Sequence, residues 1–169
     1  DILGATDNDS KPDGEFFHWL GPFQWAERIF GNSEVIFRAD AQLTQDPLLP
    51  MEKFVVGGAD TVRGYRENQL VRDNGLVASL ELRVPVLPKH TGEARLRVAP
   101  FTDYGRSWND GTTPKHKNIA SAGVGLLLDY KKLNARVYWA HDFDDIDNGN
   151  VDDDLQDDGV HFSVSYSVF

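Results

Sequence analysis

The fold class is decided by a segment that reads Ala120-Ser-Ala-Gly-Val-Gly-Leu-Leu-Leu-Asp-Tyr130, then Lys131-Lys132, then Leu133-Asn-Ala-Arg-Val-Tyr-Trp139. In its first part, apolar residues occupy the even-numbered positions, and serine, glycine and aspartate occupy most of the odd-numbered ones. In its last part, the apolar residues occupy the odd-numbered positions. An apolar residue at every second position is typical of a β-strand, because successive side chains point to opposite faces. Two such runs joined by a short connection predict an antiparallel hairpin.

The same alternation recurs through most of the chain. It predicts an all-β fold, with about seven antiparallel strands that meander and almost no helix. Several runs are about ten residues long, which is close to the length that crosses a bilayer at a tilt. The expected strands are residues 16–30, 33–45, 75–86, 94–105, 119–130, 133–141 and 159–169.

The connections between the expected strands differ strongly in length. Lys131-Lys132 leaves room only for a tight turn, whereas segments 47–74, 107–118 and 141–158 are long and rich in glycine, proline, asparagine and aspartate. Short turns at one rim and long loops at the other are typical of an outer-membrane β-barrel.

The composition excludes several classes of protein. The chain has 169 residues and a net charge of −10, which argues against nucleic acid as the main partner, because phosphate binding requires clustered lysine and arginine. No stretch approaches the roughly 20 consecutive apolar residues of a membrane-spanning helix. The absence of cysteine excludes disulfides, zinc–thiolate sites and cysteine nucleophiles. Because the chain begins at Asp1 without a signal segment, we expect a processed product or a piece of a longer protein.

Periodicity alone leaves two interpretations open. A soluble sandwich or barrel would place the apolar residues inside, whereas a transmembrane barrel would turn them toward lipid and line a wet lumen with polar residues. The polar positions hold many arginines, glycines and serines, which is unusual for a water-exposed surface. Aromatic residues also lie near the ends of expected strands, as in the interfacial girdles of membrane barrels: Trp25, Tyr104, Trp108, Tyr130, Trp139, Tyr166 and Phe169.

Residues 54–65, which read Phe-Val-Val-Gly-Gly-Ala-Asp-Thr-Val-Arg-Gly-Tyr, do not have the composition of an ordinary loop. Gly57 and Gly58 permit a tight backbone reversal with positive φ. Arg63 then offers one guanidinium beside a glycine, and such a group at a loop tip requires a carboxylate partner. The candidate partner is Asp103, which lies on the polar side of its expected strand.

These residues carry a resemblance to a known family. Gly57-Gly58 followed by Val62-Arg63-Gly64-Tyr65 resembles the signature of the large lumen loop in outer-membrane β-barrel translocases. Phe101-Thr-Asp103-Tyr-Gly105 resembles the matching motif on the inner wall. That superfamily includes the insertase of the BAM complex and the transporters of two-partner secretion. Segments 66–75 and 79–85 look like the second branch, which exports haemolysins and haemagglutinins.

The resemblance implies a fold, a site and a set of partners. The loop over residues 47–74 would fold back into the lumen, with Arg63 contacting Asp103. The chain would be the C-terminal part of a barrel whose early strands and periplasmic POTRA domains lie outside it. Its partners would be a large secreted protein, outer-membrane lipid and the barrel assembly machinery, which would recognise Phe169 as an assembly signal. The lumen wall would carry the charges of the polar strand positions: Arg38, Asp40, Glu81, Arg83, Arg95, Arg97 and Arg136.

We therefore expect a translocase of the bacterial outer membrane that exports a haemolysin- or adhesin-type partner, is not an enzyme and uses no cofactor or metal. Two alternatives share parts of the pattern. A BAM-type insertase has both motifs, and a soluble β-barrel or sandwich could bind a ligand in a polar interior. A third alternative is an enzyme that uses Glu81 and Asp103 as paired carboxylates, but the neighbouring arginines favour a salt-bridged wall.

The other candidate sites have simpler explanations. Segment 141–158 is dense in aspartate, but an EF-hand with Gly149 at the glycine position would put Ile146 and Leu155 at ligand positions. We expect a solvated acidic loop there, with at most weak binding of divalent ions. The five histidines form no close pair at metal-ligand spacing. The chain also lacks a Gly-x-Ser-x-Gly nucleophile motif.

Overall fold

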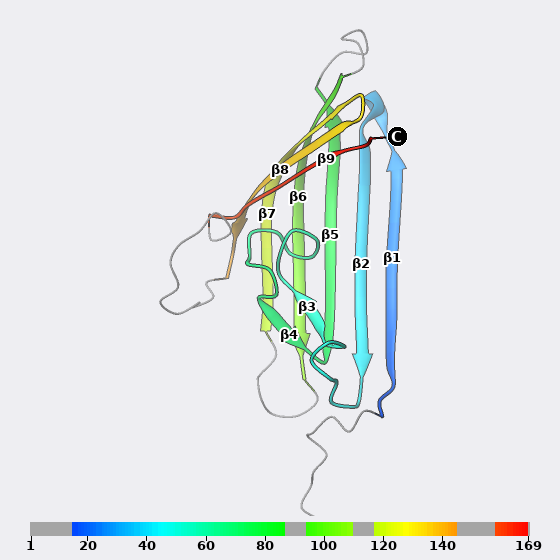
Figure 1. The fold of residues 1–169 in the computed structure, drawn as a ribbon, viewed down its shortest axis with the longest axis vertical. Helices are drawn as coiled ribbons and strands as arrows, with labels where there is room; N and C mark the ends of the chain where they lie inside the picture. Colours follow the sequence, from blue (N-terminus) through cyan, green and yellow to red (C-terminus); the bar gives the residue numbers. More distant parts are fainter. Residues whose placement is uncertain (1–14, 87–93, 110–116, 145–157, 169) are drawn as a thin grey trace, which may run out of the picture.

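The computed structural model describes residues 15–86, 94–109, 117–144 and 158–168 of the 169-residue chain. These residues form a seven-stranded antiparallel sheet and a separate two-stranded sheet (Figure 1). This confirms the expected all-β fold with meandering strands. Across the large sheet the order is β1 (His18–Arg28), β2 (Glu34–Thr44), β5 (Asn74–Pro85), β6 (Ala94–Trp108), β7 (Lys117–Tyr130), β8 (Leu133–Asp142) and β9 (Val160–Tyr166). The small sheet pairs β3 (Phe54–Val56) with β4 (Leu70–Arg72).

Helical structure contributes little to the described residues. They contain one short 3₁₀ turn, η1 (Phe30–Asn32), which joins β1 to β2. None of the described residues forms a helix long and apolar enough to span a membrane.

Short and long connections lie at opposite ends of the large sheet (Figure 1). Lys131-Lys132 joins β7 to β8 as a tight turn, in which Lys131 has a φ of 53°. At the other end, residues 45–73 connect β2 to β5 and contain the small sheet. We call residues 45–73 the inner loop.

The last strand is shorter than the expected range of 159–169. Leu133, the first residue of β8, pairs with Tyr166, so β8 offers no partner for residues beyond Tyr166. The Ser167 N–H instead donates to the carbonyl of Lys132 at 2.9 Å. Phe169, the expected assembly signal, lies outside the described residues.

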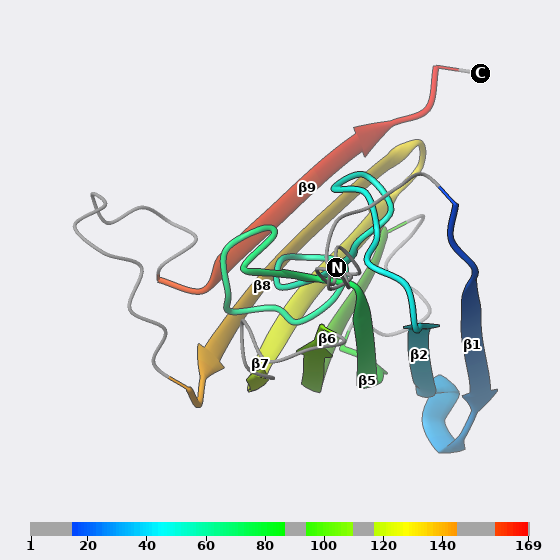
Figure 2. The ribbon, with the colours of Figure 1, turned by 90° about the horizontal axis from the view of Figure 1, so that it is seen from below.

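The large sheet is curved, and the inner loop lies on its concave side (Figure 2). β3 contacts both β5 and β6, and β4 contacts β6. A small apolar core forms where the inner loop meets the sheet, and it holds the loop over the middle strands. Its members are Val56, Val62, Tyr65, Leu70, Val77 and Ile119, with Phe54 packed against them.

The two faces of the sheet differ in the side chains that they bury and expose. The concave face buries charged side chains, with Glu81 only 2% and Asp103 only 1% exposed. Soluble proteins rarely expose large contiguous apolar patches, so the convex face is suited to lipid and the transmembrane interpretation holds. That face exposes large apolar side chains: Trp19, Phe23, Trp25, Leu43, Leu76, Leu80, Val124, Leu126, Val137, Trp139, Phe162 and Val164.

Candidate functional site

The inner loop turns back between β3 and β4 and carries Arg63 at its tip. Gly57, at a φ of 109°, begins the turn, and its N–H donates to Thr61 Oγ1 at 2.8 Å. Gly64 has a φ of 95°, and a Cβ added there would lie 3.0 Å from the Cβ of Ala140 on β8. Glycine at these positions lets the backbone adopt left-handed conformations and approach the wall closely.

Arg63 is buried against two carboxylates of the concave face. Its backbone N–H and Nε donate to Asp103 Oδ2 at 3.1 and 2.8 Å, and its Nη2 donates to Asp103 Oδ1 at 2.8 Å. Its Nη1 donates to Glu81 Oε2 at 2.6 Å, and its Nη2 also donates to Ser79 Oγ at 3.1 Å. The bidentate contact with Asp103 fixes both the position and the orientation of the guanidinium. One side chain thus joins the inner loop to both β5 and β6.

The charges of this cluster balance. Arg83 Nε donates to Glu81 Oε1 at 2.6 Å, so two guanidinium groups face two carboxylates. Burial alone would lower the pKa of Arg63, but the hydrogen bonds and charges of Asp103 and Glu81 outweigh burial and raise that pKa. Arg63 therefore remains charged, and each buried carboxylate retains a cationic partner.

Two aromatic rings complete the surroundings of the guanidinium. Arg63 Cζ lies 3.5 Å from the centroid of the Phe101 ring and 4.8 Å from that of Tyr138. A Cβ added at Gly123 would lie 2.7 Å from the Phe101 ring, and one at Gly125 would lie 2.4 Å from the Tyr138 ring. Glycines on the polar side of β7 therefore make room for both rings. Sequence reasoning singled out Phe101 but not Tyr138, although these glycines were a signal for a bulky neighbour.

The next two residues of the loop tip attach to other strands. The Gly64 N–H donates to Nε2 of His161 on β9 at 3.1 Å. The Tyr65 hydroxyl donates to the Ala120 carbonyl on β7 at 2.9 Å and accepts from the Asp144 N–H at 3.2 Å. Burial raises the pKa of Tyr65, which keeps the phenol protonated as a donor. Consecutive residues of the tip are thus tied to β5, β6, β7 and β9.

A second group of contacts, which we call the base contacts, fixes the start and the end of the inner loop. Asp73 is 4% exposed, accepts from the Leu48 N–H at 3.1 Å and pairs with Lys53 Nζ at 2.9 Å. Gln42 Nε2 donates to the carbonyls of Glu52 and Asp73 at 2.9 and 3.0 Å. Sequence reasoning missed these residues. The available signal was a glutamine at the polar end of one expected strand and an aspartate just before the next.

The other expected wall charges lie on the concave face outside the Arg63 cluster. Arg97 forms an ion pair with Asp129, which joins β6 to β7. The remaining four are exposed or half-buried: Arg38, Asp40, Arg95 and Arg136.

The expected acidic loop is described only at its two ends. Residues 145–157 lie outside the described part of the chain. At the start of this segment, Asp144 Oδ2 accepts from the Ala120 N–H at 3.1 Å. Across the described ranges, no group of three or more histidine, aspartate or glutamate side chains could hold a metal ion.

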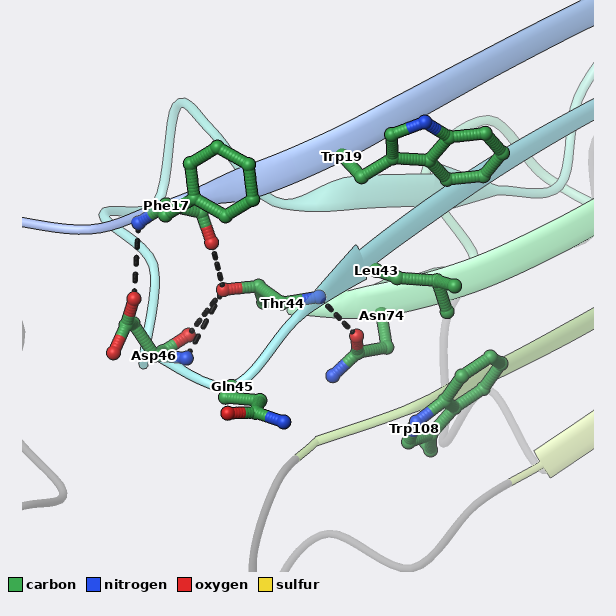
Figure 3. A pocket seen from close by; sticks show the side chains of 8 residues that line it. All are labelled: Phe17, Trp19, Leu43, Thr44, Gln45, Asp46, Asn74 and Trp108. Atoms are coloured by element: carbon green, nitrogen blue, oxygen red, sulfur yellow. Dashed lines mark hydrogen bonds between the residues drawn. The ribbon is translucent and has the colours of Figure 1, made fainter.

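A separate pocket of about 680 Å³ lies where β1 begins and β2 ends (Figure 3). Hydrogen bonds connect several of the residues that line it. The Thr44 hydroxyl donates to the Phe17 carbonyl at 2.8 Å, and the Thr44 N–H donates to Asn74 Oδ1 at 2.7 Å. None of the expected site residues lines it; the lining residues are Phe17, Trp19, Leu43, Thr44, Gln45, Asp46, Asn74 and Trp108.

Comparisons with known proteins identify a family and a similar fold. The model of a family described as haemolysin secretion/activation protein ShlB/FhaC/HecB matches residues 1–128. Among solved structures, CdiB from Acinetobacter baumannii is similar with a TM-score of 0.54 and 16% identity, over 88% of this chain and 25% of that chain. The chain thus spans about a quarter of the length of CdiB and shares its fold. No curated protein matches the sequence.

Proposed function

The chain belongs to the haemolysin secretion/activation protein family ShlB/FhaC/HecB, whose members are two-partner secretion transporters of the bacterial outer membrane, and we propose that it forms the C-terminal wall and inner loop of such a transporter. Its family is one of secretion proteins, which agrees with the expectation of a protein without enzymatic activity. The chain spans about a quarter of the length of CdiB. We therefore propose transport as an activity of the complete protein, to which this chain would contribute one part.

The observation that carries the proposal is the burial of Arg63 against Asp103 and Glu81 on the concave face of a sheet whose convex face is apolar. In a closed barrel the concave face becomes the lumen wall. A hydrated, charged lumen allows an unfolded polypeptide to cross the membrane without losing its hydration. The inner loop would then occupy the lumen and serve as a plug or as support for a gate.

The Arg63 cluster would hold this loop in a single register. Arg63 contacts β5 and β6 while Tyr65 contacts β7, so a sliding loop would break several contacts together. Moving the loop tip away from the wall would leave Asp103 and Glu81 as buried charges without Arg63, which is costly. Passage of the partner therefore requires the loop to leave a path beside it or to move aside at that cost.

The proposed cargo is a large secreted protein of the haemolysin or adhesin type. Family membership favours export over the alternative of a BAM-type insertase. Upstream strands and POTRA domains would complete the barrel and receive the cargo in the periplasm. The barrel assembly machinery would insert the protein into outer-membrane lipid, with Phe169 as the assembly signal.

The test is secretion by cells that lack the complete transporter. Its cognate partner should disappear from the medium and accumulate in the periplasm or be degraded there, while the other outer-membrane proteins keep their normal levels. Restoring the complete gene should restore secretion. A general loss of outer-membrane proteins would indicate an insertase and contradict the proposal.

A further inference from the structure

We propose that His161 is a proton-sensitive latch that holds the tip of the inner loop against β9. The side chain lies on the concave face and is 7% exposed. Its Nε2 accepts the backbone N–H of Gly64, the residue next to Arg63, at 3.1 Å. The contact joins positions 97 residues apart in the sequence.

The direction of this hydrogen bond sets the protonation state of the ring. A neutral imidazole has one nitrogen that accepts and one that donates, and the Gly64 N–H requires Nε2 to be the acceptor. The ring proton must therefore lie on Nδ1. Protonation of Nε2 would turn the acceptor into a donor that faces another donor, so the bond to Gly64 would be lost.

The surroundings of the ring determine what protonation would disturb. The charged groups that act on the imidazole are Glu67 and Arg63 of the inner loop and Asp103 of β6. On β8, the residue paired with His161 is Tyr138. A protonated ring would be repelled by Arg63 but attracted by Glu67 and Asp103, so these charges act in opposite directions. Acidification would therefore weaken the hold on the loop tip through loss of the Gly64 acceptor.

The position of His161 in the sheet determines which parts of the molecule the bond to Gly64 connects. β9 is an edge of the large sheet within the described residues and pairs with β8 alone. The latch thus couples the loop tip to an edge strand of the described sheet. On the basis of the proposed function, release of the latch would be one step in clearing the lumen.

The experiment measures exposure of the loop tip directly, so it does not depend on transport. In the complete protein, purified in detergent and free of other cysteines, Val62→Cys places a thiol at a position that is 0% exposed. Asp60→Cys, at an exposed position of the same loop, is the matched control. Dividing the maleimide labelling rate of the first variant by that of the second removes the pH dependence of the thiol itself.

We expect this ratio to rise about tenfold as the pH falls from about 8 to about 5, which is the range in which imidazole titrates. A tenfold change is comparable to the loss of one buried hydrogen bond. His161→Gln, whose amide oxygen can accept from Gly64 but cannot gain a proton in this range, should give a low ratio at every pH. His161→Phe, which offers no acceptor, should give a high ratio at every pH. A heat-modifiable band on a denaturing gel confirms the barrel of each variant.

Two results would overturn the latch. One is a ratio that does not change with pH in the background with native His161. The other is a pH dependence that persists in His161→Gln, a variant that remains informative even if His161→Phe does not fold. Failure of the proposed function would look different: labelling would follow the expected pattern while cells lacking the transporter still secrete the partner.

Discussion

Arg63 uses Nε, Nη1 and Nη2 together, so a single planar group holds Asp103 and Glu81 at the same time. A lysine ammonium is a compact point charge and cannot reproduce this bidentate geometry. Removing the guanidinium would leave Asp103 without its cationic partner in a buried position. Breaking a buried ion pair from one side costs about 3–5 kcal/mol, because the remaining charge is uncompensated.

The first prediction concerns this residue. Arg63→Ala in the complete transporter should reduce secretion of the partner by at least about tenfold, while barrel insertion falls much less, because the apolar convex face does not depend on the loop anchor. Secreted partner in the medium and the heat-modifiable band in the outer membrane measure the two effects. Arg95→Ala removes an exposed arginine from the same face and is the control. Normal export by Arg63→Ala would refute the anchoring role.

Residue-level contacts differ in how far sequence could predict them. The paired motifs implied that Arg63 contacts Asp103, and the structure brings them to 2.8 Å. No sequence motif indicated the contacts of His161 and Asp73, because their donors include the backbone N–H groups of Gly64 and Leu48. Every residue except proline carries that donor, so side-chain chemistry gives no hint of which one is used.

At the scale of elements, alternation predicted the long strands because the period of two follows from the extended backbone itself. β3 and β4 have 3 residues each, which is too short to display a period. Their pairing depends on an apolar core shared with Val77 of β5 and Ile119 of β7, and this core exists only once the inner loop lies on the sheet. Sequence therefore indicated the position of the loop but not its internal hairpin.

The second prediction concerns the base contacts of the inner loop. Asp73→Ala removes the acceptor of the Leu48 N–H and the partner of Lys53, while the Arg63 cluster remains intact. We expect trypsin to cleave the inner loop of the intact barrel several-fold faster, because the start of the loop loses two attachments. Mapping the cleaved bonds by mass spectrometry should place the first new cut after Lys53.

Asp60→Ala provides the control for this prediction, because Asp60 is an exposed aspartate of the same loop. Its cleavage rate should match that of the protein without the substitution. Equal protection of the Asp73→Ala variant would mean that the tip contacts alone hold the loop, and the base contacts would then have no anchoring role.

At the scale of the whole molecule, the sheet is one curved wall whose two edges are β1 and β9 in the described part of the chain. An unpaired strand edge presents backbone donors and acceptors that cannot be satisfied in hydrocarbon. Each edge therefore requires a pairing partner before the wall can lie in a membrane. This requirement agrees with a chain that spans about a quarter of CdiB.

The last prediction tests which face of this wall meets lipid. Leu80 lies on the convex face of β5 and is 47% exposed, whereas Asp40 lies on the concave face of the neighbouring β2. A lysine on the lipid face near the middle of the bilayer costs about 2–4 kcal/mol, so Leu80→Lys should sharply lower the amount of heat-modifiable barrel in the outer membrane. Asp40→Lys changes the charge by more but faces a hydrated lumen, and it should leave that amount nearly unchanged. The opposite ranking of the two variants would mean that Leu80 faces water, and the polarity of the whole wall would have to be reversed.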